Sequence, residues 1–282
     1  MSCCRMPNRN AEVHANPLLH GVDFTSAPRR SKGITIASGD LVRSTFTLRD
    51  LTTLHNFDSF AGWLRQPGPW LAGFDFPFSF PRELITQLGW PTEWPALIRH
   101  VATRTRSELR ETFKAVCDAR PVGSKFIHRA TDLISGSSPS MKWVNPPVAY
   151  MLHAGAPMLL AAEVSIPLMH AGDPHRIALE AYPGMVARSI TRDSYKNDAR
   201  AMQTPERRAT RLSIIKALES GDYPQAIVLD AGKHRQALLD DGSGDLLDAV
   251  LCALLAAWGW QRRDSNYGLP PHDALEGWIV GA

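Results

Sequence analysis

Four acidic residues lie within stretches of sequence that are otherwise apolar. Asp23 lies in LLHGVDFT, Asp75 in WLAGFDFPF, Glu180 in RIALEAYP and Asp248 in DLLDAVLCALLAAW. An ionised carboxylate in an apolar setting is costly unless it is paired, hydrogen-bonded or bound to a cation. Each of these acids therefore needs a partner, and a shared site would supply one.

A divalent cation is the partner that suits such a cluster. Asp245 precedes Asp248 by three residues, which places both on one helical face. Carboxylate oxygens are preferred ligands of Mg²⁺ and Mn²⁺, and two such ions ~3.5–4 Å apart can activate water for phosphodiester hydrolysis. The predicted metal ligands are Asp23, Asp75, Asp245 and Asp248, and the predicted catalytic residues are Asp23, Asp75, Glu180 and Asp248.

Each acid also has a structural alternative. Asp23 and Asp75 can cap the proline-containing turns that follow their strands. Asp245 can serve the first turn of its helix, where a negative charge complements the helix dipole. Glu180 can form an ion pair with a nearby arginine instead of facing the site.

Five predicted strands and two helices have to position these acids. The strands span residues 18–25, 33–38, 44–51, 70–78 and 176–182. Apolar residues at 57, 60, 61 and 64 predict a helix between the third and fourth strands, and residues 243–260 predict a long buried helix. The first three strands read as an antiparallel meander, and the fourth returns beside the first as a parallel crossover. Residues 276–280 can add a short edge strand.

Ribonuclease H-like domains share this order of elements. We therefore expect an α/β protein with a ribonuclease H-like mixed five-stranded sheet flanked by helices. A helical insertion is expected at about 81–165, between the fourth and fifth strands, within a single domain at 17–282 that follows a flexible leader at 1–16.

Composition places the chain among ordinary globular proteins, with 44% hydrophobic and 21% charged residues. The longest apolar run, residues 249–258, is shorter than the ~20 residues that cross a bilayer, so no membrane association is expected. The leader lacks the apolar stretch of a secretory signal, and the four cysteines show neither disulfide nor zinc spacing. We expect a cytoplasmic protein.

Basic residues recur every four positions after the fifth strand, at Arg188, Arg192, Lys196 and Arg200. If helical, they form a stripe that attracts the phosphates of a nucleic acid. A second basic block spans 99–129, and both blocks can alternatively be solvated helix faces. The net charge of +3 permits a nucleic-acid partner but does not establish one.

Five short segments carry a resemblance to a known family: GVDFTSAP (21–28), GFDFPF (73–78), EAYPG (180–184), DLLDAVLCALLAAW (245–258) and EGWIV (276–280). In order and spacing they resemble the domain of unknown function 429 family of predicted ribonuclease H-like nucleases, from about residue 18 onward. The resemblance implies that Asp23 is the first-strand acid, Asp75 the fourth-strand acid and Asp248 the helix acid, with Glu180 before Tyr-Pro. Asp58 is the nearest candidate for a first-helix acid.

The predicted function is a Mg²⁺- or Mn²⁺-dependent nuclease that hydrolyses phosphodiester bonds in DNA or RNA. One alternative is a non-catalytic module of the same fold that binds nucleic acid or protein. A second is an ATP-dependent phosphotransferase, which the absence of GxGxxG and GxxxxGK[ST] disfavours. Serine hydrolases and zinc proteases are disfavoured because GxSxG and HExxH are also absent.

Overall fold

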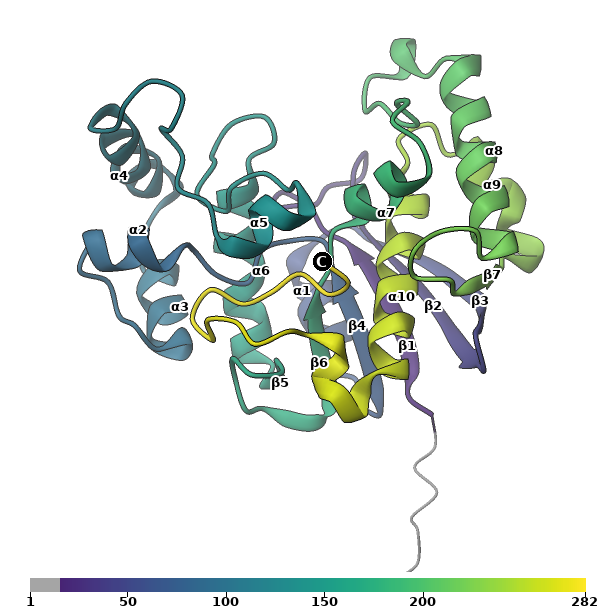
Figure 1. Ribbon diagram of the computed structural model, residues 1–282, viewed down its shortest axis with the longest axis horizontal. Coiled ribbons are helices and arrows are strands. Elements are labelled where there is room, and N and C mark those ends of the chain that lie inside the picture. The colour runs from purple at the N-terminus through teal and green to yellow at the C-terminus, as the bar shows by residue number, and fades with distance from the viewer. Residues whose placement is uncertain (1–15) are drawn as a thin grey trace, which may run out of the picture.

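The computed structural model describes residues 16–282, which form a mixed sheet of seven strands with helices on both faces (Figure 1). Residues 1–15 of the predicted leader lie outside the described residues. The α/β class is confirmed. Within residues 16–282, no helix has the length and apolar character that a membrane span requires.

The strands follow the order β5-β6-β4-β1-β2-β3-β7 across the sheet. Their bounds are β1 Leu18–Asp23, β2 Ile34–Val42, β3 Thr45–Leu54, β4 Trp70–Phe74, β5 Val164–Ser165, β6 Asp173–Glu180 and β7 Val228–Asp230. β1, β2 and β3 form the expected antiparallel meander, and β4 pairs in parallel with both β1 and β6.

The sheet has two strands more than the five predicted from the sequence. β5 and β7 contain only two and three residues, which is too short for a periodic pattern of apolar residues to reveal them. The predicted edge strand at 276–280 is reduced to one isolated parallel bridge between Ile279 and Glu180.

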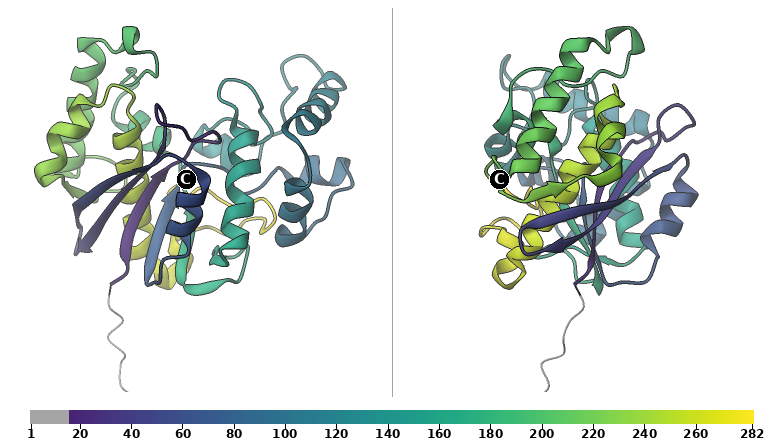
Figure 2. Two further views of the ribbon diagram at one scale, coloured as in Figure 1. Left: turned by 180° about the vertical axis from the view of Figure 1, so that it is seen from behind. Right: turned by 90° about the vertical axis from the view of Figure 1, so that its right-hand side faces the viewer.

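The helices divide between the two faces of the sheet. Their bounds are α1 Phe57–Leu64, α2 Arg82–Gln87, α3 Trp94–Ala102, α4 Arg106–Asp118, α5 Ala130–Ser135, α6 Val148–Ala161, α7 Pro183–Ile190, α8 Pro205–Ser220, α9 Arg235–Asp240 and α10 Asp245–Gln261, with short 3₁₀ turns η1 Arg200–Met202, η2 Gly232–His234 and η3 Arg263–Gly268. α1 and α6 cover one face, whereas α10 and α7–α9 cover the other (Figure 2).

Alternation along the strands decides which residues face α10. Leu19 and Leu71 pack into the core on the α10 side, and Val22 and Phe74 pack on the α1 side. Because successive side chains of a strand point to opposite faces, residues 21, 23, 73 and 75 also belong to the α10 side. Asp23 and Asp75 are therefore directed toward the same helix.

Two glycines let α10 approach the sheet at that place. Gly21 of β1 and Gly73 of β4 are paired in the parallel register. A Cβ atom on Gly21 would overlap the backbone of Ala249 and Ala253, and one on Gly73 would lie 2.5 Å from the carbonyl oxygen of Cys252. The buried helix consequently lies directly on the strand backbones, with its N-terminal turn near the ends of β1 and β4.

The predicted helical stripe of basic residues is wrong. α7 ends at Ile190, residues 191–199 form an irregular loop, and Arg200 belongs to η1. Short polar side chains bind the backbone locally in this segment: Thr191 Oγ1 accepts from the amide of Asp193, and Asn197 Oδ1 accepts from that of Ala199 at 2.8 Å. Such bonds compete with helix formation, so the four-residue spacing does not produce a common face.

Candidate functional site

Asp23 and Asp75 lie side by side at the carboxyl ends of two parallel strands. Val22 is paired with Phe74, and the backbone amide of Asp75 donates to the carbonyl of Val22 at 2.9 Å. Asp23 directly follows Val22 in the sequence, and Asp75 directly follows Phe74. The predicted parallel crossover therefore places both acids at one edge of the sheet.

Asp248 approaches the same place from the first turn of α10. Its side chain is fully buried and accepts hydrogen bonds from the hydroxyl of Tyr195 and the ammonium of Lys196. The three-residue spacing from Asp245 places both acids in the first turn, as predicted. Asp248 thus has two hydrogen-bond donors within the protein.

The carboxylates of Asp23 and Asp75 are poorly stabilised in their charged forms. Burial raises the pKa of Asp23 well above its ordinary value, and the negative charges of Asp248, Asp245 and Asp75 raise it further. Burial, followed by the charge of Asp248, raises the pKa of Asp75 to about 7. These mutual effects show that the structure brings Asp23, Asp75 and Asp248 into one electrostatic cluster, with Asp245 at its edge.

Neither strand aspartate caps the turn that follows it. Among residues 16–282, no group donates a hydrogen bond to the carboxylate of Asp23 or Asp75. Asp23 is nevertheless only 9% exposed. The two acids therefore remain without the partners that the turn-capping alternative would have supplied.

Lys196 provides positive charge to this cluster. It lies in the loop between α7 and η1, and its ammonium forms an ion pair with Asp248. Burial is the largest single influence on the pKa of Lys196 and lowers it, but the charges of Asp248, Tyr195 and Asp23, together with the hydrogen bond to Asp248, raise the pKa well above its ordinary value. Lys196, which was predicted to contact nucleic acid, is thus also the ionic partner of a predicted metal ligand.

Asp245 lies at the rim of the cluster and has its own partner. Lys32, in the loop between β1 and β2, donates to Asp245 at 3.3 Å and to Asp198 at 2.5 Å. Burial raises the pKa of Asp245, and the charge of Lys32 partly opposes this rise. The loop after Asp23 is therefore tied to the helix that carries the other acids.

Glu180 forms the ion pair with an arginine that was its structural alternative, and its catalytic role stays a prediction. It ends β6, one strand beyond Asp75, and both of its oxygens accept from the guanidinium of Arg129, at 2.6 and 2.8 Å. The backbone amide of Phe78 adds a third bond at 3.0 Å. Arg129 also pairs with Asp132, and all three charged side chains are buried. Glu180 thus acts on the cluster through its charge, which contributes to the raised pKa of Asp75.

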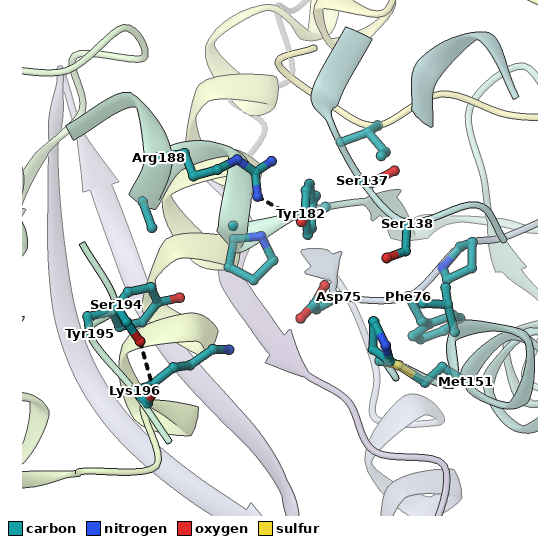
Figure 3. A pocket seen from close by; sticks show the side chains of 18 of the residues that line it. Asp75, Phe76, Ser137, Ser138, Met151, Tyr182, Arg188, Ser194, Tyr195 and Lys196 are labelled. Carbon is teal, nitrogen blue, oxygen red and sulfur yellow. Dashed lines mark hydrogen bonds between the residues drawn. The ribbon is translucent and has the colours of Figure 1, made fainter. Parts of the chain in front are cut away.

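A cavity of about 450 Å³ opens beside Asp75 (Figure 3). Its lining includes Asp75, Phe76, Ser137, Ser138, Met151, Tyr182, Arg188, Arg192, Tyr195 and Lys196. Three of the four predicted basic contact residues, Arg188, Arg192 and Lys196, therefore surround one cavity although they share no helix. Arg200 is not part of the lining.

The carboxylates of this cluster satisfy only part of what a hard divalent cation requires of its ligands. Asp23 and Asp75 offer carboxylate oxygens that lack hydrogen-bond donors, which is the chemistry that Mg²⁺ and Mn²⁺ prefer. Asp248 can contribute only if Lys196 moves, because the lysine ammonium already binds it. No three His, Cys, Asp or Glu side chains in the described part of the chain are close enough together to hold a metal ion. Asp58 is exposed on α1, which packs on the opposite face of the sheet from α10.

Several residues of the site were not found from the sequence. Gly21 and Gly73 each precede a strand aspartate by two positions, so the repeated pattern Gly-x-Asp-Phe was the available signal. Nothing in the sequence around Tyr195 indicates Asp248 as its partner, because 53 residues separate the two. Arg129 comes from a segment 51 residues before Glu180, a separation that conceals the pair.

Comparisons of this chain with models of protein families, with curated proteins and with solved structures found no match.

Proposed function

We propose that this protein is a divalent-metal-dependent phosphodiesterase that acts on nucleic acid, with Asp23 and Asp75 as the ligands of Mg²⁺ or Mn²⁺. The observation that carries the proposal is the pairing of two aspartates at adjacent parallel strand ends, without hydrogen-bond donors and with raised pKa values. A bound cation would remove the electrostatic cost that these pKa values report.

The order of the longer strands supports a ribonuclease H-like assignment. β6, β4, β1, β2 and β3 lie in that sequence across the sheet, and β2 alone among them is antiparallel to β1 and β3. This arrangement is what the resemblance to predicted ribonuclease H-like nucleases leads us to expect. The two short strands extend the sheet at its edges without altering this order.

Each residue of the site has a role in this proposal. A bound divalent cation supplies a Lewis acid for the phosphate and lowers the pKa of a bound water. Asp23 and Asp75 would hold the cation, and Asp75 lines the cavity. Arg192 and Lys196 line the same cavity and attract the negatively charged substrate. Tyr195 and Lys196 hold the side chain of Asp248 in one orientation.

One observation favours the non-catalytic alternative, in which the fold serves only as an interaction module. The positive charge of Lys196 already compensates part of the acidic cluster, since it binds Asp248 directly. In that alternative the charge of Asp23 and Asp75 is dispensable, and binding of the partner survives their replacement by asparagine.

Calorimetric titration with Mn²⁺ tests the proposed function. We expect wild-type protein to bind Mn²⁺ and to cleave at least one member of a set of single-stranded, duplex and hybrid DNA and RNA. Asp23→Asn and Asp75→Asn should abolish both properties, whereas Asp58→Asn, at an exposed acid on the other face of the sheet, should retain them. Wild-type protein that neither binds Mn²⁺ nor cleaves any of these nucleic acids contradicts the proposal, and stabilisation by ATP-Mg²⁺ would favour a phosphotransferase instead.

A further inference from the structure

The cavity beside Asp75 has two chemically different ends. Figure 3 shows Lys196 on one side of Asp75, with Phe76 and Met151 on the other. Arg192, from the same segment between α7 and η1 as Lys196, also lines the cavity, and Val148 of α6 adds to the apolar lining. A ligand that spans the cavity would therefore meet positive charge at one end, an aspartate in the middle and apolar surface at the other end.

Arg188 fixes the shape of this cavity. Its guanidinium lies 4.9 Å from the ring centre of Tyr182 and donates to the hydroxyl of that tyrosine at 2.9 Å. It also donates to the carbonyl of Ser135 at 2.8 Å and so connects α7 with the end of α5. Because these contacts occupy Arg188, it forms part of the cavity wall. Lys196 shares its charge with Asp248, whereas Arg192 has no ion pair among the described residues and offers its charge to a ligand.

The dimensions of the cavity limit what can enter it. A volume of about 450 Å³ lies in the ~300–1,000 Å³ range of sites for small molecules. One nucleotide fits such a space, and a base-paired duplex does not. Enzymes that act on a single nucleotide of a strand commonly take it out of the base stack into a pocket of this kind.

We infer that this cavity receives one unpaired nucleotide of a nucleic-acid strand, an inference that rests on the proposed function. The base lies against Phe76, Met151 and Val148, where apolar surface replaces the stacking that the base loses. The phosphate lies toward Arg192 and Lys196, next to Asp75. The substrate class is therefore a single strand or an unpaired end.

Fluorescence anisotropy with labelled oligonucleotides in metal-free buffer tests this inference independently of the metal site. We expect a single-stranded decamer to bind at least ten-fold more tightly than a blunt duplex of the same sequence. Val148→Trp and Ser138→Trp fill the cavity from two different elements, and each should weaken single-strand binding about ten-fold. Arg192→Glu should also weaken it, whereas Lys216→Glu, at an exposed cation on α8 outside the cavity, should not. Thermal unfolding of each variant shows that it is folded.

Different results separate this inference from the proposed function. Single-strand binding that both filling variants weaken, in a protein that binds no Mn²⁺, would retain the nucleotide pocket and remove the hydrolytic function. Metal-dependent cleavage within a blunt duplex, unchanged by folded Val148→Trp and Ser138→Trp proteins, would retain the function and overturn the pocket. Binding of free mononucleotides without binding of the strand would overturn it as well.

Discussion

Gly21 and Gly73 lie opposite one another in β1 and β4, and both contact the backbone of α10. Each glycine precedes a strand aspartate by two residues. The absence of two Cβ atoms is therefore what allows Asp248 to reach Asp23 and Asp75. The packing of the helix on the sheet and the assembly of the acidic cluster depend on the same contact.

We expect Gly21→Ala to destabilise the protein by about 1–3 kcal/mol, as overpacking of a core does, because the new methyl group meets rigid backbone. It should also weaken Mn²⁺ binding, because α10 must move away from the strands. Gly62→Ala is the matched control, since a Cβ atom there meets nothing within 4 Å in the middle of α1. The free energy of unfolding of the Gly62→Ala control should increase by about 0.5–1 kcal/mol. Equal effects of the two substitutions in urea unfolding would contradict this account.

The raised pKa of Asp75 predicts a dependence of stability on pH. The pKa of Asp75 is about 7 in the folded protein, whereas its ordinary value, which applies to the unfolded chain, is 3.8. Its contribution to stability is therefore fully present below pH 3.8 and is lost as the pH rises through 7. In metal-free buffer at pH 8, Asp75→Asn should be more stable than wild type by roughly 2–4 kcal/mol.

Urea unfolding between pH 5 and pH 9 measures this effect, and added Mg²⁺ should stabilise the wild type most at the alkaline end, where Asp75 is ionised. Asp58→Asn should leave the pH profile unchanged, because that acid is exposed on α1. The contrary result is a free energy of unfolding that rises between pH 5 and pH 8 without metal, equally in wild type and in Asp75→Asn. That result would show that the acidic cluster does not destabilise the fold.

Lys196→Met removes the ionic partner of Asp248, which is fully buried. We expect the free energy of unfolding to fall by about 1–3 kcal/mol. This is less than for an ion pair with both side chains buried, because the lysine side chain is 42% exposed. The double variant Lys196→Met/Asp248→Asn should recover part of this loss, since no uncompensated charge remains. Lys196→Met should also bind Mn²⁺ more tightly if the lysine competes with the metal for Asp248. Calorimetry and denaturant unfolding of the four proteins in this cycle provide both readouts.

The sequence predicted the parts of the site that follow from local patterns. Apolar strands with a parallel crossover were enough to place Asp23 beside Asp75, and the long apolar run predicted α10. The basic residues at 188–200 were misread, because a spacing of four residues is also compatible with a loop held by Thr191 and Asn197. The partners of the buried charges were beyond reach, since they come from segments that only the fold brings together.

The ion pair of Arg129 and Glu180 provides the decisive comparison between a structural and a catalytic acid. Arg129→Met leaves Glu180 and Asp132 buried without their cation, and we expect a loss of about 3–5 kcal/mol. Glu180→Gln keeps an acceptor for Phe78 and loses only the charge, so it should be destabilised while any nuclease turnover, measured below its unfolding temperature, stays within a few-fold of wild type. Asp75→Asn should show the opposite pattern, with turnover lost and stability at pH 8 increased. If Glu180→Gln instead abolishes turnover in a fully folded protein, Glu180 belongs to the catalytic group and its pair with Arg129 serves to orient it.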